Sequence, residues 1–185
     1  MTGVQTCALP ISSTGALVVG LAAPETFAQA PASPPNPASP NNPSILATKL
    51  DSYLAIRKDG TVDVFFGAID GGQGLETSIS QMVAEELEVP LDKVNMILAD
   101  TARTINMGGA SGALSVSRRG FTLRKAAAEA RTILVAEAAR KLGVSAVALA
   151  ASDGVVFVKA DPAKRISYAE LIGDQQFGRD VKIGR

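Results

Sequence analysis

The sequence predicts an α+β fold, with a small mixed sheet and two main helices in residues 45–185. Three observations predict it. Two alternating apolar segments flank the Asp59-Gly60 pair, apolar residues recur at helical spacing after a glycine-rich turn, and a second helical pattern reaches about Leu142. Hydrophobic residues make up 46% of the chain but aromatic residues only 4%, so alanine and valine must do much of the packing.

The first half of this region is expected to contain three strands and one helix. Residues 53–57 and 61–66 form a predicted hairpin, because Asp-Gly between alternating apolar segments is a strong turn signal. A helix follows at about 75–86 and stops before Pro90. Its apolar positions are Leu75, Ile79, Met82, Val83 and Leu87. Alternation at 94–98 predicts a third strand.

The second long helix follows another glycine-rich loop, which opens at Asp100 and runs through Gly112. The helix is expected to reach about Leu142 and to end at Gly143. Gly120 is expected to break or cap it.

Two further elements are expected near the end of the chain. Asp153-Gly154 predicts a small hairpin. A helix is expected from Ser167, because Ser167 and Glu170 have the spacing of a capping box.

The first forty-four residues do not have the composition of a folded domain. Residues 1–11 resemble the translation of a sequencing-library adapter, an artefact that leaves the true start of the gene missing. Residues 12–30 contain a nine-residue apolar run and end at Ala28-Gln29-Ala30, typical of the back half of a secretory signal peptide. The alternative is an alanine-rich tail. Residues 31–44 are proline-rich and predict a flexible linker.

Composition excludes several kinds of site within the chain. There is no histidine and a single cysteine, Cys7, so a His/Cys metal site, a Cys-ligated iron–sulfur cluster and a Ser-His-Asp triad are excluded. Eighteen basic and eighteen acidic residues cancel, which argues against nucleic acid as the main partner. The apolar run is too short for a stable membrane span.

The candidate site is the turn at 67–77, between a strand end and a helix start. Its glycines let the backbone approach a ligand closely, and the N–H groups of the first helical turn favour an anionic group. Gln73 stands between Gly72 and Gly74, and its amide carries both a donor and an acceptor. The alternative is a tight turn whose glycines serve only the backbone. Neither of the better-known phosphate-binding glycine patterns is present.

An ordered set of motifs over residues 45–177 resembles the molybdopterin-binding large subunit of the xanthine dehydrogenase family. The resemblance is closest to the branch that includes the isoquinoline 1-oxidoreductase beta subunit. The motifs are 70–77, 81–87, Asp100-Thr101, 109–113, 123–131 and 167–171. On this resemblance residues 45–185 are the amino-terminal part of a larger molybdopterin-binding domain. Asp70 replaces the family's usual glutamate and Gly71 a bulkier residue, so the turn is expected to be looser here.

The resemblance implies an oxidoreductase that hydroxylates aldehydes or N-heterocycles with oxygen from water. The implied cofactor is molybdopterin, as its cytosine dinucleotide. The implied partners are a small 2Fe–2S subunit, a cytochrome c acceptor and a small-molecule substrate. Cofactor contacts are expected at Gly72, Gln73 and Gly74 and, in the second loop, at Ser111, Gly112 and Ala113. The family's catalytic glutamate matches no residue here.

The resemblance also implies a periplasmic protein exported by the twin-arginine route. Two alternatives stay open from the residues alone. One is an exported, non-enzymatic binding domain in which Ser111 and Thr101 are only caps and turn formers. The other is a nucleotide-binding enzyme, which lacks the acidic ribose partner at the expected spacing.

Overall fold

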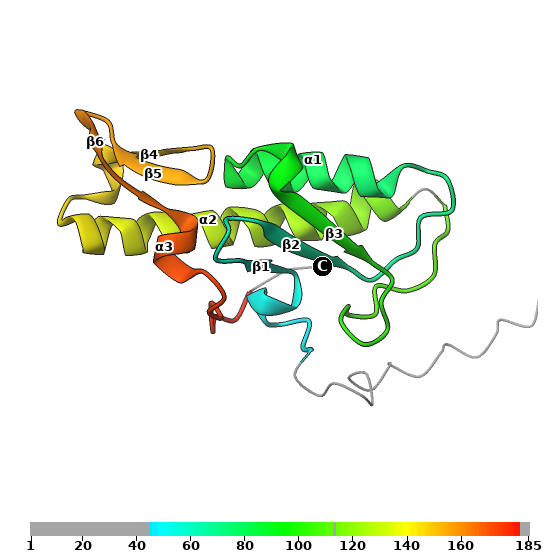
Figure 1. The fold of residues 1–185 in the computed structure, drawn as a ribbon. Helices are drawn as coiled ribbons and strands as arrows, with labels where there is room; N and C mark the ends of the chain where they lie inside the picture. The colour runs from blue at the N-terminus through cyan, green and yellow to red at the C-terminus, as the bar shows by residue number, and fades with distance from the viewer. Residues whose placement is uncertain (1–44, 113, 182–185) are drawn as a thin grey trace, which may run out of the picture. The chain divides into compact units, whose positions relative to one another are not determined.

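The computed structural model describes residues 45–112 and 114–181, all within one compact unit, Asn36–Arg185. The segments expected at 1–11, 12–30 and 31–44 lie outside the described residues, as does Ala113. The described part contains two three-stranded sheets, two long helices and several short helices, which confirms the predicted α+β class (Figure 1).

The first sheet has the order β1-β2-β3 and is mixed, as expected. β1 (Leu54–Ile56) pairs antiparallel with β2 (Val62–Phe66) across the predicted Asp59-Gly60 turn, where Gly60 has a φ of 82°. β2 continues through α1 (Leu75–Leu87) to β3 (Val94–Leu98), which pairs parallel with β2. Both strand ends therefore point the same way, which a parallel crossover requires.

The second long helix begins differently from the expectation. A π-helix, η3 (Ser115–Gly120), leads without a break into α2 (Phe121–Leu142). Gly120 neither breaks nor caps the helix but packs against α1: a Cβ there would lie 2.7 Å from Cδ1 of Ile79. Gly143, at a φ of 66°, ends α2 as predicted.

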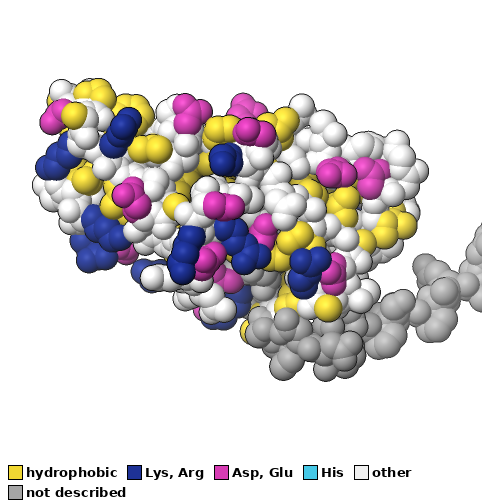
Figure 2. Space-filling model, viewed as in Figure 1, with side chains coloured by type: hydrophobic (Ala, Val, Ile, Leu, Met, Phe, Trp, Pro, Cys, Tyr) yellow, Lys and Arg dark blue, Asp and Glu magenta, His cyan; other side chains and the backbone are white. Residues whose placement is uncertain are grey.

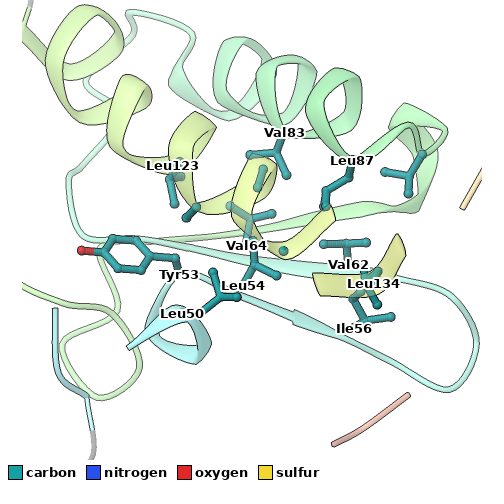
Figure 3. Packing of buried hydrophobic residues seen from close by; sticks show 14 of the residues in the cluster. Leu50, Tyr53, Leu54, Ile56, Val62, Val64, Val83, Leu87, Leu123 and Leu134 are labelled. Carbon is teal, nitrogen blue, oxygen red and sulfur yellow. The ribbon is translucent and has the colours of Figure 1, made fainter. Parts of the chain in front are cut away.

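The core lies between the first sheet and the two long helices. Figure 3 shows Leu54, Ile56, Val62 and Val64 of the sheet directed at residues of α1 and α2. Val62, Val64, Leu87 and Leu123 are fully buried. α2 turns a row of alanines towards this core, which lets the helices approach closely without aromatic side chains. That row is Ala126, Ala127, Ala130 and Ala138.

A second, antiparallel sheet has the order β4-β5-β6. β4 (Leu149–Ser152) and β5 (Val155–Val158) form the predicted hairpin. β6 (Asp161–Ser167) was not predicted from the sequence, because its residues are mostly exposed and do not alternate. α3 (Tyr168–Ile172) follows, and the capping box at Ser167 and Glu170 is confirmed in both directions.

Three single-turn 3₁₀-helices complete the described elements: η1 (Leu50–Ser52), η2 (Leu91–Lys93) and η4 (Ala146–Ala148). η1 is tied to the end of the described chain, because the Asp51 carboxylate accepts hydrogen bonds from the Phe177 and Gly178 N–H groups at 2.6 and 3.0 Å. Within the described residues no helix is both long enough and apolar enough to cross a membrane.

Candidate functional site

Both glycine-rich connections leave the same edge of the first sheet. The first glycine loop (67–74) follows the carboxyl end of β2, and the second glycine loop (100–112) comes after that of β3. Figure 1 shows them at the end of the described body away from β4–β6. The space beyond the carboxyl ends of parallel strands is where α/β sheets generally bind ligands.

The two loops touch through their backbones. The position where Gly67 would carry a Cβ lies 1.6 Å from the Ile105 carbonyl oxygen and 3.3 Å from the Met107 nitrogen. Behind this contact the Ala99 N–H donates to the Phe66 carbonyl at 2.8 Å, which extends the pairing of β2 and β3 by one step. Only glycine at position 67 allows the loops to lie this close.

The start of α1 is occupied by a carboxylate of the protein itself. Asp70 Oδ2 accepts from the Leu75 N–H at 2.7 Å, and Oδ1 accepts from the Gly72 N–H at 2.9 Å. Longer contacts, of 3.3 and 3.4 Å, come from the N–H groups of Gly74 and Glu76. These bonds, that from Gly72 first, lower the pKa of Asp70. In this conformation the anionic group that these N–H groups favour is the carboxylate of Asp70 and not a ligand.

Gln73 also closes the first glycine loop from within. Its Oε1 accepts from the Gly71 N–H at 2.7 Å, and its Nε2 donates to the Ile69 carbonyl at 3.2 Å. Gly72 and Gly74 have φ angles of 102° and 71°, which only glycine adopts without strain. The loop is therefore tied together rather than loose, in contrast to the sequence expectation. The compensation comes from Asp70, whose role the sequence analysis missed.

The second glycine loop has most of its internal hydrogen bonds at its start, where Asp100 accepts from the N–H groups of Ala102, Arg103 and Thr104. Asn106 accepts from the Gly108 N–H at 2.8 Å, and the Asp100 carbonyl accepts from Thr104. Among the described residues, the N–H groups of Gly109, Ala110 and Ser111 donate to no acceptor. Ser111 and Gly112 are exposed on this loop.

The predicted cofactor contacts therefore fall on two touching loops. Among the described residues, no hydrogen bond joins residues 72–74 of the first loop directly to Ser111 or Gly112 of the second. Figure 2 shows mainly uncharged surface at the end with the loops, with acidic and hydrophobic side chains and few Lys or Arg. An anionic group would be held there by backbone N–H groups rather than by cations. The second loop fits this role. The first loop offers exposed glycine backbone but has most of its donors already bonded.

Titration of Asp70 gives a test of the first loop. Because its folded pKa is depressed, the stabilisation by its carboxylate is present above the ordinary pKa of about 3.9 and is lost as the pH falls through the folded value. We expect Asp70→Asn to unfold at lower urea concentration than the wild type at pH 7, and the difference to shrink below about pH 4. Asp92→Asn, at an exposed position of η2, is the control. A difference that stays constant down to the lowest pH would contradict the carboxylate cap.

The chain is similar to part of several molybdenum enzymes. It is 38% identical over 130 residues to one subunit of the nicotinate dehydrogenase of Pseudomonas putida, covering 70% of this chain and 11% of that protein. It is 32% identical over 143 residues to the beta subunit of isoquinoline 1-oxidoreductase from Brevundimonas diminuta, covering 74% and 18%. The chain thus spans less than a fifth of the length of these two relatives.

Solved structures agree with these relatives. Quinoline 2-oxidoreductase from Pseudomonas putida 86 superposes with a TM-score of 0.55 at 29% identity, over 64% of this chain and 15% of that one. The CO dehydrogenase of Oligotropha carboxidovorans gives 0.57 at 28%, with the same coverage. A family model described as a molybdopterin cofactor-binding domain matches residues 34–183. This match covers most of the chain and confirms the resemblance: the chain belongs to the molybdopterin cofactor-binding domains of the xanthine dehydrogenase family.

Proposed function

We propose that residues 45–185 form one wall of the cofactor site in the large subunit of a molybdenum hydroxylase. One observation carries the proposal: two glycine loops about forty residues apart meet backbone to backbone beyond the carboxyl ends of β2 and β3. When bound, the molybdenum–pterin group supplies the oxidation of an aldehyde or N-heterocycle with oxygen from water. The residues of the two loops bind and orient this group, and none is assigned a catalytic role.

The two loops have different roles. The second glycine loop offers the exposed N–H groups of Gly109, Ala110 and Ser111, which suit the oxygens of a phosphate or the polar edge of a pterin. Near the first loop the half-buried carboxylate of Asp70 and the exposed carboxylate of Glu76, at the start of α1, disfavour an anion. We therefore assign the anionic part of the cofactor to the second loop and a shape-determining role to the first.

The finer features of the enzyme are inferred from the family. We propose molybdopterin cytosine dinucleotide as the form of the cofactor, and a small 2Fe–2S subunit that receives electrons and passes them to a cytochrome c. The nicotinate dehydrogenase and isoquinoline 1-oxidoreductase relatives are each one subunit of a larger enzyme, which supports a multi-subunit assembly. The apolar run in 12–30 supports export to the periplasm, by the twin-arginine route because the cofactor is loaded into folded protein.

One observation favours an exported binding domain without enzymatic activity. Asp70 and Gln73 satisfy the first glycine loop internally, so this loop is complete without any ligand. The matched family and the exposed donors of the second loop favour the hydroxylase. The two candidates differ in whether disturbing the first loop alters cofactor binding.

Gln73 decides between them in the complete large subunit produced with its partner subunits. Gln73→Ala removes both hydrogen bonds that close the first loop, which is worth about 1–3 kcal/mol, so we expect roughly ten- to a hundred-fold weaker cofactor retention. Gln73→Glu should be worse, because it loses the donor to Ile69 and places a second carboxylate beside Asp70. Molybdenum and pterin per polypeptide are measured together with turnover.

The matched control is Gln81→Ala, which removes an exposed glutamine from the middle of α1. It should retain the cofactor content of the wild type. Full cofactor content and unchanged turnover in both Gln73 variants would show that the first loop is only a turn and would favour the binding domain.

A further inference from the structure

Arg119 connects the second glycine loop to the start of the long helix. Its Nε donates to the Met107 carbonyl at 2.6 Å, and its Nη2 donates to the Gly109 carbonyl, also at 2.6 Å. Its Nη1 donates to the Ser115 hydroxyl at 3.0 Å. One half-buried guanidinium thus holds two backbone carbonyls that lie ten and twelve residues before it in the chain.

The π-helix provides a rigid base for this side chain. Ser115 is buried, and Gly120 packs so closely on α1 that a Cβ would lie 3.4 Å from Sδ of Met82. π-helical turns of this kind are frequent at functional sites. Arg119 is therefore fixed at its backbone by α1, while residues 105–112 of the loop it holds have few hydrogen bonds of their own.

Holding a carbonyl also sets the direction of the neighbouring N–H group. In a trans peptide the C=O and the following N–H point in opposite directions. When Arg119 donates to the Gly109 carbonyl, the Ala110 N–H points away from the guanidinium. Likewise, the hydrogen bond from Arg119 to the Met107 carbonyl fixes the direction of the Gly108 N–H, which donates to Asn106. The Ala110 N–H has no such acceptor among the described residues, and Ala110 is exposed.

We propose that Arg119 is the positioning residue of the second glycine loop. It holds the backbone of residues 107–110 in the conformation that presents outward N–H donors to an oxygen of the cofactor. This inference rests on the proposed function for the identity of the ligand, but the positioning itself is a property of this chain. Arg119 acts through the loop and is not proposed to touch the cofactor.

Hydrogen exchange of the 185-residue chain tests the positioning directly. Arg119→Ala should speed exchange of the Gly108 N–H, which is bonded to Asn106 and follows the Met107 carbonyl that Arg119 holds, by roughly tenfold or more. Exchange in β2 and α1 should stay as in the wild type. Arg118→Ala, which removes the adjacent exposed arginine, is the control and should change neither region. Equal exchange in all three proteins would overturn the proposal.

Cofactor content of the complete large subunit tests the consequence. Arg119→Ala should retain roughly tenfold less molybdenum and pterin per polypeptide than the wild type or Arg118→Ala. Added guanidinium ion should restore part of the loss, and Arg119→Lys should retain an intermediate amount, neither of which a general loss of folding would produce. If Arg119→Ala retained as much molybdenum and pterin as the wild type while its loop exchanged faster, the proposal that Arg119 positions the loop for the cofactor would be overturned. A wild-type subunit without molybdenum would instead refute the proposed function, and the exchange result would still decide whether Arg119 positions the loop.

Discussion

Gly67→Ala is expected to force the two glycine loops apart and to destabilise the chain by about 3 kcal/mol or more. The added Cβ would lie 1.6 Å from the Ile105 carbonyl oxygen and 2.8 Å from the carbonyl carbon, far inside van der Waals contact. Neither side can yield easily. Position 67 is fixed by β2, which ends at Phe66, and Ile105 is itself buried. A whole domain is stable by only about 5–15 kcal/mol, so the variant is expected to be partly unfolded.

A matched control lies in the second loop. Gly109 has an ordinary φ, and no atom would lie within 4 Å of its added Cβ, so Gly109→Ala should stay within about 0.5 kcal/mol of the wild type. Urea unfolding followed by circular dichroism compares the three proteins. If Gly67→Ala and Gly109→Ala unfold at the same urea concentration as the wild type, the loops do not touch, and the observation that carries the cofactor site is lost.

The elements that the sequence predicted correctly are those with local causes. Asp59-Gly60 specifies a turn by itself, Gly143 ends a helix because it adopts a positive φ, and Ser167 with Glu170 closes a capping box within one helical turn. The parallel strand at 94–98 was also found, from the alternation of its own residues. Each of these signals lies within a few residues, so no knowledge of distant contacts is needed.

The elements that were missed have no signal in their own residues. β6 has an exposed, non-alternating sequence and exists because it pairs with β5. The role of Gly120 depends on Ile79 of another helix. In both cases the cause lies in the partner element and is not visible in the periodicity of the residues themselves.

The candidate site also contains features that the sequence predicted and features that it did not. The glycine loops were located from spacing alone, and the family comparison confirms the resemblance they suggested. The directions of side chains within the loops were not predicted. Gln73 turns back onto Gly71 and Ile69 because the φ angles of Gly72 and Gly74 fold the loop around it. Asp70 offered a signal, an acidic residue shortly before a helix start. Arg119 offered none, because its bonds depend on the π-helix.

The other large effect is expected at Tyr168, which joins α3 to the end of α1. The side chain is 2% exposed, and its hydroxyl donates to the Leu87 carbonyl at 2.9 Å. Tyr168→Ala should cost about 3–5 kcal/mol through the cavity and the lost hydrogen bond. Tyr168→Phe keeps most of the packing and should cost about 1–3 kcal/mol, because the Leu87 carbonyl is left buried without its donor.

Alkaline unfolding separates the hydroxyl from the packing. Burial raises the pKa of Tyr168 to about 12, whereas an unfolded tyrosine ionises near 10. A raised folded pKa means that this stabilisation is fully present below about pH 10 and is lost as the pH rises towards 12, by roughly 2–3 kcal/mol in all. The free energy of unfolding of Tyr168→Phe should therefore fall less between these pH values than that of the wild type.

The chain contains two tyrosines, so Tyr53→Phe leaves Tyr168 as the only one. Tyrosinate absorbance in that variant then reports the ionisation of Tyr168 directly, and it should coincide with alkaline unfolding measured by circular dichroism. The burial of the Tyr168 hydroxyl against the Leu87 carbonyl predicts this coincidence, because the hydroxyl becomes accessible to solvent only when Tyr168 leaves the end of α1. Ionisation near pH 10 in a chain that is still folded would show that Tyr168 is not held at the end of α1.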